Sequence, residues 1–169
     1  MKQIMTLSDR DLTNIILLTL GNMKIKDPYF YPLFKIMHLT GCRLEEALNR
    51  EAWEIKTTNL VTLKTVKNNH IRIIDETNSD DIATLINLLQ NHYYITSQKS
   101  NVLKIANLYL NQYNIYHQNK KLTTSIFRHN YIKKLKAKGK TDNEIKSIMG
   151  HIQQDNTNNY IYSELLKIS

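Results

Sequence analysis

Residues 121–162, KLTTSIFRHNYIKKLKAKGKTDNEIKSIMGHIQQDNTNNYIY, decide how the rest of this chain is interpreted. Their pattern predicts a basic helix with Arg128 near its start and a second helix that ends at Gly150. His151 follows directly, and Tyr160 stands nine residues after it. Cationic or hydrogen-bonding groups and a tyrosine at these intervals can gather around one phosphodiester if other segments complete the site.

Length and composition place the chain among single globular domains. With 169 residues, of which 41% are hydrophobic and 22% charged, it has enough apolar material for one core, so we expect one domain spanning residues 1–169. It contains no apolar run long enough to cross a bilayer, and residues 1–11 lack the pattern of a secretory leader. A single cysteine, Cys42, excludes an internal disulfide and fits a reducing compartment. These features predict a cytoplasmic protein.

The net charge of +8 is concentrated in one part of the chain. Residues 1–81 hold 11 acids and 11 bases, whereas residues 82–141 hold 10 bases and no acid. Eight of these bases lie between Lys120 and Lys140. Positive charge gathered in this way favours a polyanionic partner such as nucleic acid. A solvated lysine-rich helix face is the simpler alternative.

The apolar spacing predicts a series of helices. Ser8 is a typical N-cap, and the helix after it is expected to stop at Gly21 and Asn22. A second helix is expected to open at Asp27 and Pro28 and to end at Gly41. Further helices are expected over residues 82–94 and after Ser100, with an apolar face in each.

The period changes between these helices. Residues 52–57, 60–66 and 70–74 are rich in β-branched and aromatic side chains, and short Thr-Asn and Asn-Asn pairs with turn chemistry separate them. We therefore expect a small three-stranded antiparallel sheet in a mostly helical α+β domain. Lys64 and Lys67 lie on or just after the middle strand, where a lysine at a hairpin tip can reach toward a phosphate or a leaving oxygen.

The segment TGCRLEE begins at Thr40 and links the second helix to the sheet. Gly41 permits a tight turn, and Arg43 is expected at the start of a third helix. Glu46, one helical turn later, is expected to hold the guanidinium in place. Arginine suits a phosphate because its planar fork donates two parallel hydrogen bonds and stays charged.

In order and spacing, these segments resemble the catalytic domain of the tyrosine recombinases, the phage-integrase family. That family has an arginine in a TGxRxxE helix start, a hairpin lysine, an HxxR pair, a GH element and a tyrosine nine residues later. The resemblance implies a helical bundle with a small sheet, and a catalytic set of Arg43, Lys67, Arg128, His151 and Tyr160. Lys67 matches better than Lys64, because it precedes Arg72 by five residues in KNNHIR.

The same resemblance implies a complete activity. The chain would cleave and rejoin DNA strands through a 3′-phosphotyrosine, without a metal or other cofactor, as a tetramer on double-stranded DNA. Glu46 and Ser125 would support the site, where Ser125 stands in place of the usual histidine. DNA contacts are expected from Lys64, Lys120, Lys121, Lys133 and Lys134. The match begins near Leu7, which predicts a short member without the usual N-terminal core-binding domain, whose role a separate DNA-binding protein could take.

Three alternatives stay open at this stage. A non-catalytic accessory or regulatory protein of the same fold would bind DNA without cutting it, and Ser125 fits that interpretation. A type IB topoisomerase-like enzyme would use the same chemistry but rejoin the same strand. Tyr162 is a second candidate nucleophile, although it fits the interval from His151 less well. His92 and His117 have no metal-ligand spacing with the cysteine.

Overall fold

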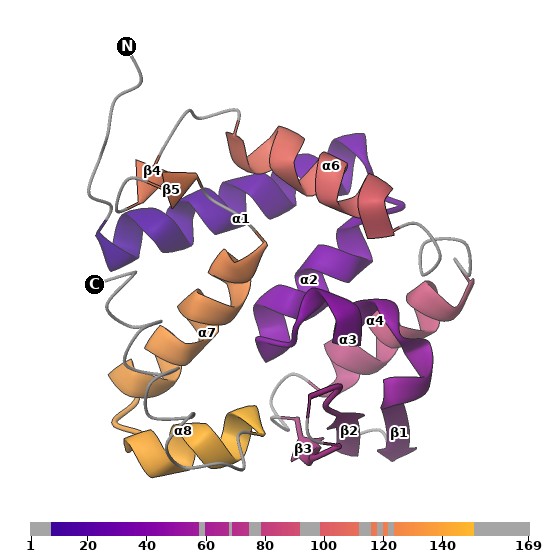
Figure 1. Ribbon diagram of the computed structural model, residues 1–169. Helices are drawn as coiled ribbons and strands as arrows, with labels where there is room; N and C mark the ends of the chain where they lie inside the picture. Colours follow the sequence, from indigo (N-terminus) through magenta and orange to yellow (C-terminus); the bar gives the residue numbers. More distant parts are fainter. Residues whose placement is uncertain are drawn as a thin grey trace.

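A computed structural model of the chain describes residues 8–57, 60–67, 69–74, 79–91, 99–111, 116–117, 120–121 and 124–150. Within these ranges the fold is mostly helical, with a three-stranded antiparallel sheet and a separate pair of short strands. The predicted α+β class and the predicted sheet are therefore confirmed. Figure 1 shows the sheet beside α8 (Asp142–Met149), on the side of the molecule opposite to α1 (Asp9–Lys26).

The first helix starts where the sequence predicts but ends later. The Ser8 hydroxyl caps α1 by accepting a hydrogen bond of 3.2 Å from a backbone N–H in its first turn. The predicted stop at Gly21 and Asn22 is wrong, because α1 continues to Lys26. One exposed glycine costs a helix only about 1 kcal/mol, and Met23, fully buried in the next turn, offsets that cost.

The second helix, α2 (Tyr31–Thr40), lies at the centre of the fold. It packs against α1, α4 (Ser79–Asn91) and α7 (Ser125–Ala137). Its start is later than predicted, since residues 28–30 form a turn and the proline that suits a helix start is Pro32. Its predicted end at Gly41 is confirmed. Most of its side chains are buried: Pro32, Leu33, Phe34, Ile36, Met37, His38 and Thr40.

The short helix α3 (Leu44–Leu48) and the 3₁₀ turn η1 (Arg50–Ala52) lead into the sheet. Its strands, in spatial order, are β1 (Trp53–Thr57), β2 (Leu60–Lys64) and β3 (Ile71–Ile73). The pairing aligns Trp53 with Leu63, and Leu63 with Arg72. These three side chains are all buried, so they form one row on the inner face of the sheet.

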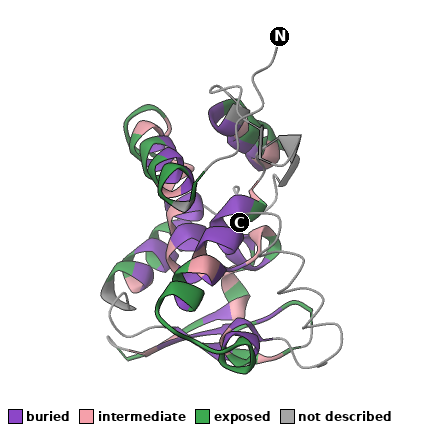
Figure 2. Ribbon diagram, turned by 90° about the vertical axis from the view of Figure 1, so that its left-hand side faces the viewer, coloured by how far each residue is buried: buried purple, intermediate pink, exposed green. Residues whose placement is uncertain are grey.

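The remaining described elements are α6 (Lys99–Asn111), β4 (Tyr116–His117) and β5 (Lys120–Lys121). Two buried clusters hold the molecule together. The larger one joins α1, α2, α4, α6, the sheet and the first turn of α7, and the smaller one joins the rest of α7 to α8. Figure 2 shows the buried side of each helix turned inward. Among the described helices, none has the length and apolar character that crossing a bilayer requires.

Candidate active site

The turn between α2 and α3 holds one of the predicted arginines in a fixed place. Gly41 adopts the left-handed conformation (φ 66°), and a Cβ there would lie 2.5 Å from the ring of Tyr131 in α7. Only glycine fits both conditions. The Thr40 hydroxyl adds a hydrogen bond of 3.2 Å from the backbone N–H two residues later. Arg43 follows at the N-cap of α3, half-buried.

Arg128 meets this turn from the other end of the chain. Its side chain is only 5% exposed, and Nη1 donates a hydrogen bond of 2.7 Å to the carbonyl oxygen of Gly41. A cavity of about 200 Å³ opens beside this contact. Its lining brings Arg43, Ser125 and Arg128 together with Met37, Cys42, Leu44 and Thr124. The structure thus gathers three predicted site residues from two distant segments around one pocket.

Glu46 accepts hydrogen bonds from backbone N–H groups of two segments and so connects this pocket to the sheet. The side chain is 1% exposed, and Oε1 accepts a hydrogen bond of 2.8 Å from the backbone N–H of Arg43. Oε2 accepts another, of 3.2 Å, from the N–H of Val66, just beyond β2. One buried carboxylate therefore ties the start of α3 to the hairpin that carries the predicted lysine.

That hairpin turns between β2 and β3. Thr65 closes it twice, because its N–H donates to the carbonyl oxygen of His70 (2.8 Å) and its hydroxyl accepts from the N–H of His70 (3.1 Å). Asn69 takes the left-handed conformation (φ 51°) that asparagine tolerates in tight turns. Lys67 is exposed at the tip, and Lys64 is exposed at the end of β2. Lys67 directly follows the residue that Glu46 holds.

The C-terminal end of α8 lies against the same hairpin. Gly150 ends the helix in the left-handed conformation (φ 77°), as predicted. A Cβ on it would lie 2.9 Å from Cγ2 of Thr65 and 3.1 Å from Cδ2 of His70, so glycine is required here for close approach as well as for backbone shape. The two remaining members of the predicted set, His151 and Tyr160, lie outside the described residues, as does Tyr162.

Sequence reasoning missed a second buried arginine next to Arg128. Arg72 in β3 is 2% exposed, and its Nη2 donates a hydrogen bond of 2.7 Å to the carbonyl oxygen of Thr40. Burial lowers the pKa of its guanidinium, and the nearby charge of Arg128 lowers it further. The order Ile71, Arg72, Ile73 indicates the opposite orientation, because an alternating strand usually buries its isoleucines; in the structure Arg72 takes the inward position.

Cys42 lines the pocket but is not poised to act as a nucleophile. It is fully buried, and burial raises the pKa of its thiol to about 12, although Arg72 and Arg128 act in the opposite direction. The thiol is therefore protonated at neutral pH, and the thiolate is the reactive form. The residues that the structure describes contain no group of three His, Cys, Asp or Glu side chains placed to hold a metal ion.

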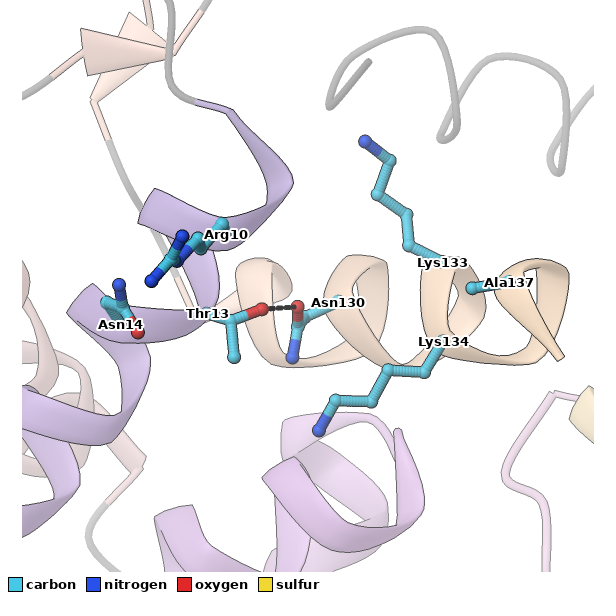
Figure 3. Close-up of a pocket in the computed structure, with 7 residues that line it drawn as sticks. All are labelled: Arg10, Thr13, Asn14, Asn130, Lys133, Lys134 and Ala137. Atoms are coloured by element: carbon cyan, nitrogen blue, oxygen red, sulfur yellow. Dashed lines mark hydrogen bonds between the residues drawn. The ribbon is translucent and has the colours of Figure 1, made fainter.

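Two of the predicted DNA-binding lysines lie on another face of α7. Lys133 and Lys134 line a second cavity, of about 290 Å³, between α1 and α7, together with Arg10, Thr13, Asn14, Asn130 and Ala137 (Figure 3). Lys133 and Lys134 point in different directions there, and Thr13 donates a hydrogen bond of 3.0 Å to Asn130. Lys120 and Lys121 form β5, paired with β4.

Comparisons of the chain with protein-family models, with curated proteins and with solved structures found no match. The geometry of the pocket and the order of the motifs are therefore the features that bear on function.

Proposed function

We propose that the chain is a site-specific DNA recombinase or integrase with the catalytic-domain fold of the tyrosine recombinases. The observation that carries the proposal is the pocket itself. Arg43 and Arg128, predicted from motifs far apart in the chain, line one cavity. The hairpin with Lys67 is joined to the same turn through Glu46. Such an arrangement fits a site that holds one scissile phosphate between two guanidinium groups.

The two arginines would act on the phosphate. A cavity of about 200 Å³ has several times the volume of one water, about 30 Å³, so a phosphodiester group fits. Guanidinium groups donate paired hydrogen bonds to non-bridging oxygens and remain charged at any working pH. Because Arg128 already has its Nη1 fixed on the Gly41 carbonyl oxygen, little reorganisation is needed when charge grows in the transition state.

The strand-breaking step would form one bond and break another at phosphorus. The phenolic oxygen of Tyr160 attacks, and the bond from phosphorus to the 5′ oxygen breaks with its electron pair left on that oxygen. An ordinary tyrosine has a pKa of about 10, so its proton must be taken up or its oxygen stabilised as it attacks. Lys67 would protonate the leaving 5′ oxygen as general acid, and His151 would hydrogen-bond the phosphate.

Rejoining is the same step in reverse with a different 5′-hydroxyl. The phosphotyrosine keeps the energy of the broken ester, so no nucleotide cofactor is required. The partner is double-stranded DNA, and exchange of strands between two duplexes would require several copies of the chain, a tetramer in the simplest arrangement. A separate DNA-binding protein could hold the other side of the duplex. A protein that acts on DNA and has a free, buried cysteine fits the reducing environment of the cytoplasm.

Ser125 favours a second candidate function. It lies in the first turn of α7 and lines the pocket next to Arg128, where the resemblance expects a histidine. Its hydroxyl is neutral, so it contributes less than an imidazolium to a negatively charged transition state. A DNA-binding accessory protein of the same fold, which holds DNA without cutting it, is the function to expect if the serine abolishes cleavage.

A covalent-trapping experiment tests the proposal. Wild type is incubated with a nicked suicide duplex that carries its site, and we expect an SDS-resistant protein–DNA adduct. Tyr160→Phe should abolish the adduct, whereas the matched variant Tyr162→Phe should retain it. Binding of duplex DNA without any adduct contradicts the recombinase proposal and supports the accessory function.

A gain-of-function variant separates the two functions further. Ser125→His places an imidazole at the pocket and should raise the rate of adduct formation about 100- to 1,000-fold, the usual range for one positioned hydrogen-bond donor to a developing charge. An adduct that forms only with Ser125→His identifies an intact fold whose serine has removed the activity. Strand exchange without relaxation of supercoils distinguishes a recombinase from a topoisomerase-like enzyme.

A further inference from the structure

In the third strand of the sheet, β3, the apolar side chains are exposed and the charged one is buried. Ile71 and Ile73 are 53% and 69% exposed, whereas Arg72 between them is 2% exposed. A shift of one residue in register would bury both isoleucines and expose the arginine, which is the usual preference of a half-buried strand. Since the pairing of Arg72 with Leu63 is set by the hairpin, the fold retains a buried charge where an apolar residue would serve packing better.

The buried guanidinium joins two segments besides its own strand. Its Nε donates a hydrogen bond of 2.7 Å to the carbonyl oxygen of Ile148, in the last turn of α8. Its Nη2 donates one of the same length to the carbonyl oxygen of Thr40, at the end of α2. Arg72 therefore links the hairpin strand, the helix end before Gly150 and the turn that carries Arg43.

The same segments converge around the arginine in other ways. The position of a Cβ on Gly150 lies 3.6 Å from Cγ of Arg72, so the helix end rests on the stem of this side chain. Both Arg72 and Arg128 donate to consecutive carbonyl oxygens of one turn, those of Thr40 and Gly41. One turn is thus held between two guanidinium groups, one of which lines the pocket.

A buried arginine is a costly way to hold a fold together. Desolvating its charge costs several kcal/mol, and well-packed apolar residues are often as stable or more stable in such places. Here burial lowers the pKa of Arg72, and repulsion from the nearby charge of Arg128 lowers it further. In addition, Nη1 of Arg72 has no hydrogen-bond partner although it is buried. The arrangement is better explained by what it positions than by what it stabilises.

We propose that Arg72 is a positioning residue that locks the Arg43 turn, the Lys67 hairpin and the end of α8 into one rigid phosphate site. The proposal rests on the recombinase function proposed above. Arg72 itself does not line the pocket, so it acts through Arg43, Arg128 and the hairpin. Its planar fork matters because it reaches two carbonyl oxygens in different directions, which a lysine ammonium on a flexible stem does less well.

The test compares three variants in adduct formation on the suicide duplex at saturating DNA. Arg72→Met removes the fork and the charge, and Arg72→Lys keeps the charge alone. Arg50→Met is the matched control, because Arg50 also donates to a backbone carbonyl oxygen, that of Trp53 at 2.9 Å, but does not line the pocket. We expect the adduct rate to fall about 100-fold in Arg72→Met and about 10-fold in Arg72→Lys, as for other residues that orient a reacting group.

A second measurement reports whether Arg72 holds the three segments together, and it does not depend on DNA cleavage. Hydrogen–deuterium exchange should rise about tenfold or more in peptides that cover residues 40–46, 64–72 and 146–150 of Arg72→Lys, with α1 unchanged. Adduct rates within about twofold of wild type in both Arg72 variants overturn the proposal. Exchange that rises equally in α1 also overturns it, because the role would then be general stability.

The two proposals fail in different ways. If wild type forms no adduct, the recombinase function fails, and the exchange pattern alone then decides whether Arg72 ties the three segments. If wild type forms the adduct and Arg72→Lys forms it equally fast with unchanged exchange, the recombinase function stands and the positioning role fails. Should Arg72→Met not fold, Arg72→Lys carries both readouts.

Discussion

The two sides of α7 present positive charge in opposite ways. On the first side, here called the pocket side, Arg128 is buried and fixed on the Gly41 carbonyl oxygen, at the wall of a pocket that Arg43 also lines. The second, here called the lysine side, faces α1. Its residues recur at intervals of three and four and so share one face: Asn130, Lys133, Lys134 and Ala137. Arg128 is two residues from Asn130, which places it on the far side of the helix.

The difference concerns preorganisation rather than charge. The guanidinium on the pocket side has its orientation set before any ligand arrives. On the lysine side, burial of part of the side chain lowers the pKa of Lys134, and the charges of Lys35 and Lys138 lower it further. Groups that repel one another on flexible stems attract a polyanion without fixing it. Under the proposed function, the pocket side would hold one phosphate, and the lysine side would attract DNA without fixing it.

The largest effect should come from making the pocket side resemble the lysine side. Arg128→Lys keeps the charge but loses the fork that bridges Gly41 and the pocket, and we expect adduct formation to fall about a thousandfold. Loss of the buried hydrogen bond should also lower the free energy of unfolding in urea by about 1–3 kcal/mol. The matched change on the other side, Lys134→Arg, should leave both within about twofold or 0.5 kcal/mol. Equal effects of the two substitutions would remove the distinction between the sides.

The second prediction concerns the turn at Gly41, whose carbonyl oxygen accepts the hydrogen bond from Arg128. Gly41→Ala places a methyl group against the ring of Tyr131 at a positive φ, and should cost about 3 kcal/mol of stability through strain and overpacking. Gly21→Ala is the control, because nothing lies within 4 Å of its Cβ position in α1. It should stabilise the protein by about 0.5–1 kcal/mol. Thermal melts of both variants measure this, and a neutral Gly41→Ala would mean that the turn is not constrained.

Local signals in the sequence predicted much of this architecture. Ser8 as a cap, Gly41 and Gly150 as helix ends, and the three strands of the sheet were each predicted from a few neighbouring residues, and each is confirmed. The stop predicted at Gly21 failed because burial of Met23 outweighs one glycine's propensity.

The candidate site was predictable only in part. Motif order pointed to Arg43 and Arg128, and the structure places both at one pocket. Arg72 escaped because a strand's inward face depends on its register with β2, which its own residues Ile71–Ile73 do not contain. The second role of Glu46 escaped for a similar reason, since its bond to Val66 joins segments 20 residues apart.

A smaller effect, dependent on pH, should come from His38, which faces the lysine side. Burial lowers the pKa of its imidazole to about 4, and Lys134 and Lys35 contribute to the shift. Because the unfolded chain binds this proton near pH 6.5, stability should fall as the pH drops from 6.5 toward 4, by about 3 kcal/mol. His38→Gln, which does not titrate, should lose this component in urea titrations at several pH values. If His38→Gln keeps the wild-type pH profile, protonation of the His38 imidazole does not cause this loss of stability.

The smallest effect should appear on the lysine side itself. Each lysine that contacts a phosphate adds about 0.9 to the slope of log affinity against log salt concentration. Since Lys133 and Lys134 point in different directions, we expect the double change to glutamine to lower that slope by about 1 and not about 2. The rate of adduct formation at saturating DNA should stay as in wild type. An unchanged slope would show that Lys133 and Lys134 do not contact DNA phosphates. A slower rate would show that these lysines help to position the scissile phosphate, and the two faces of α7 would then not differ in function.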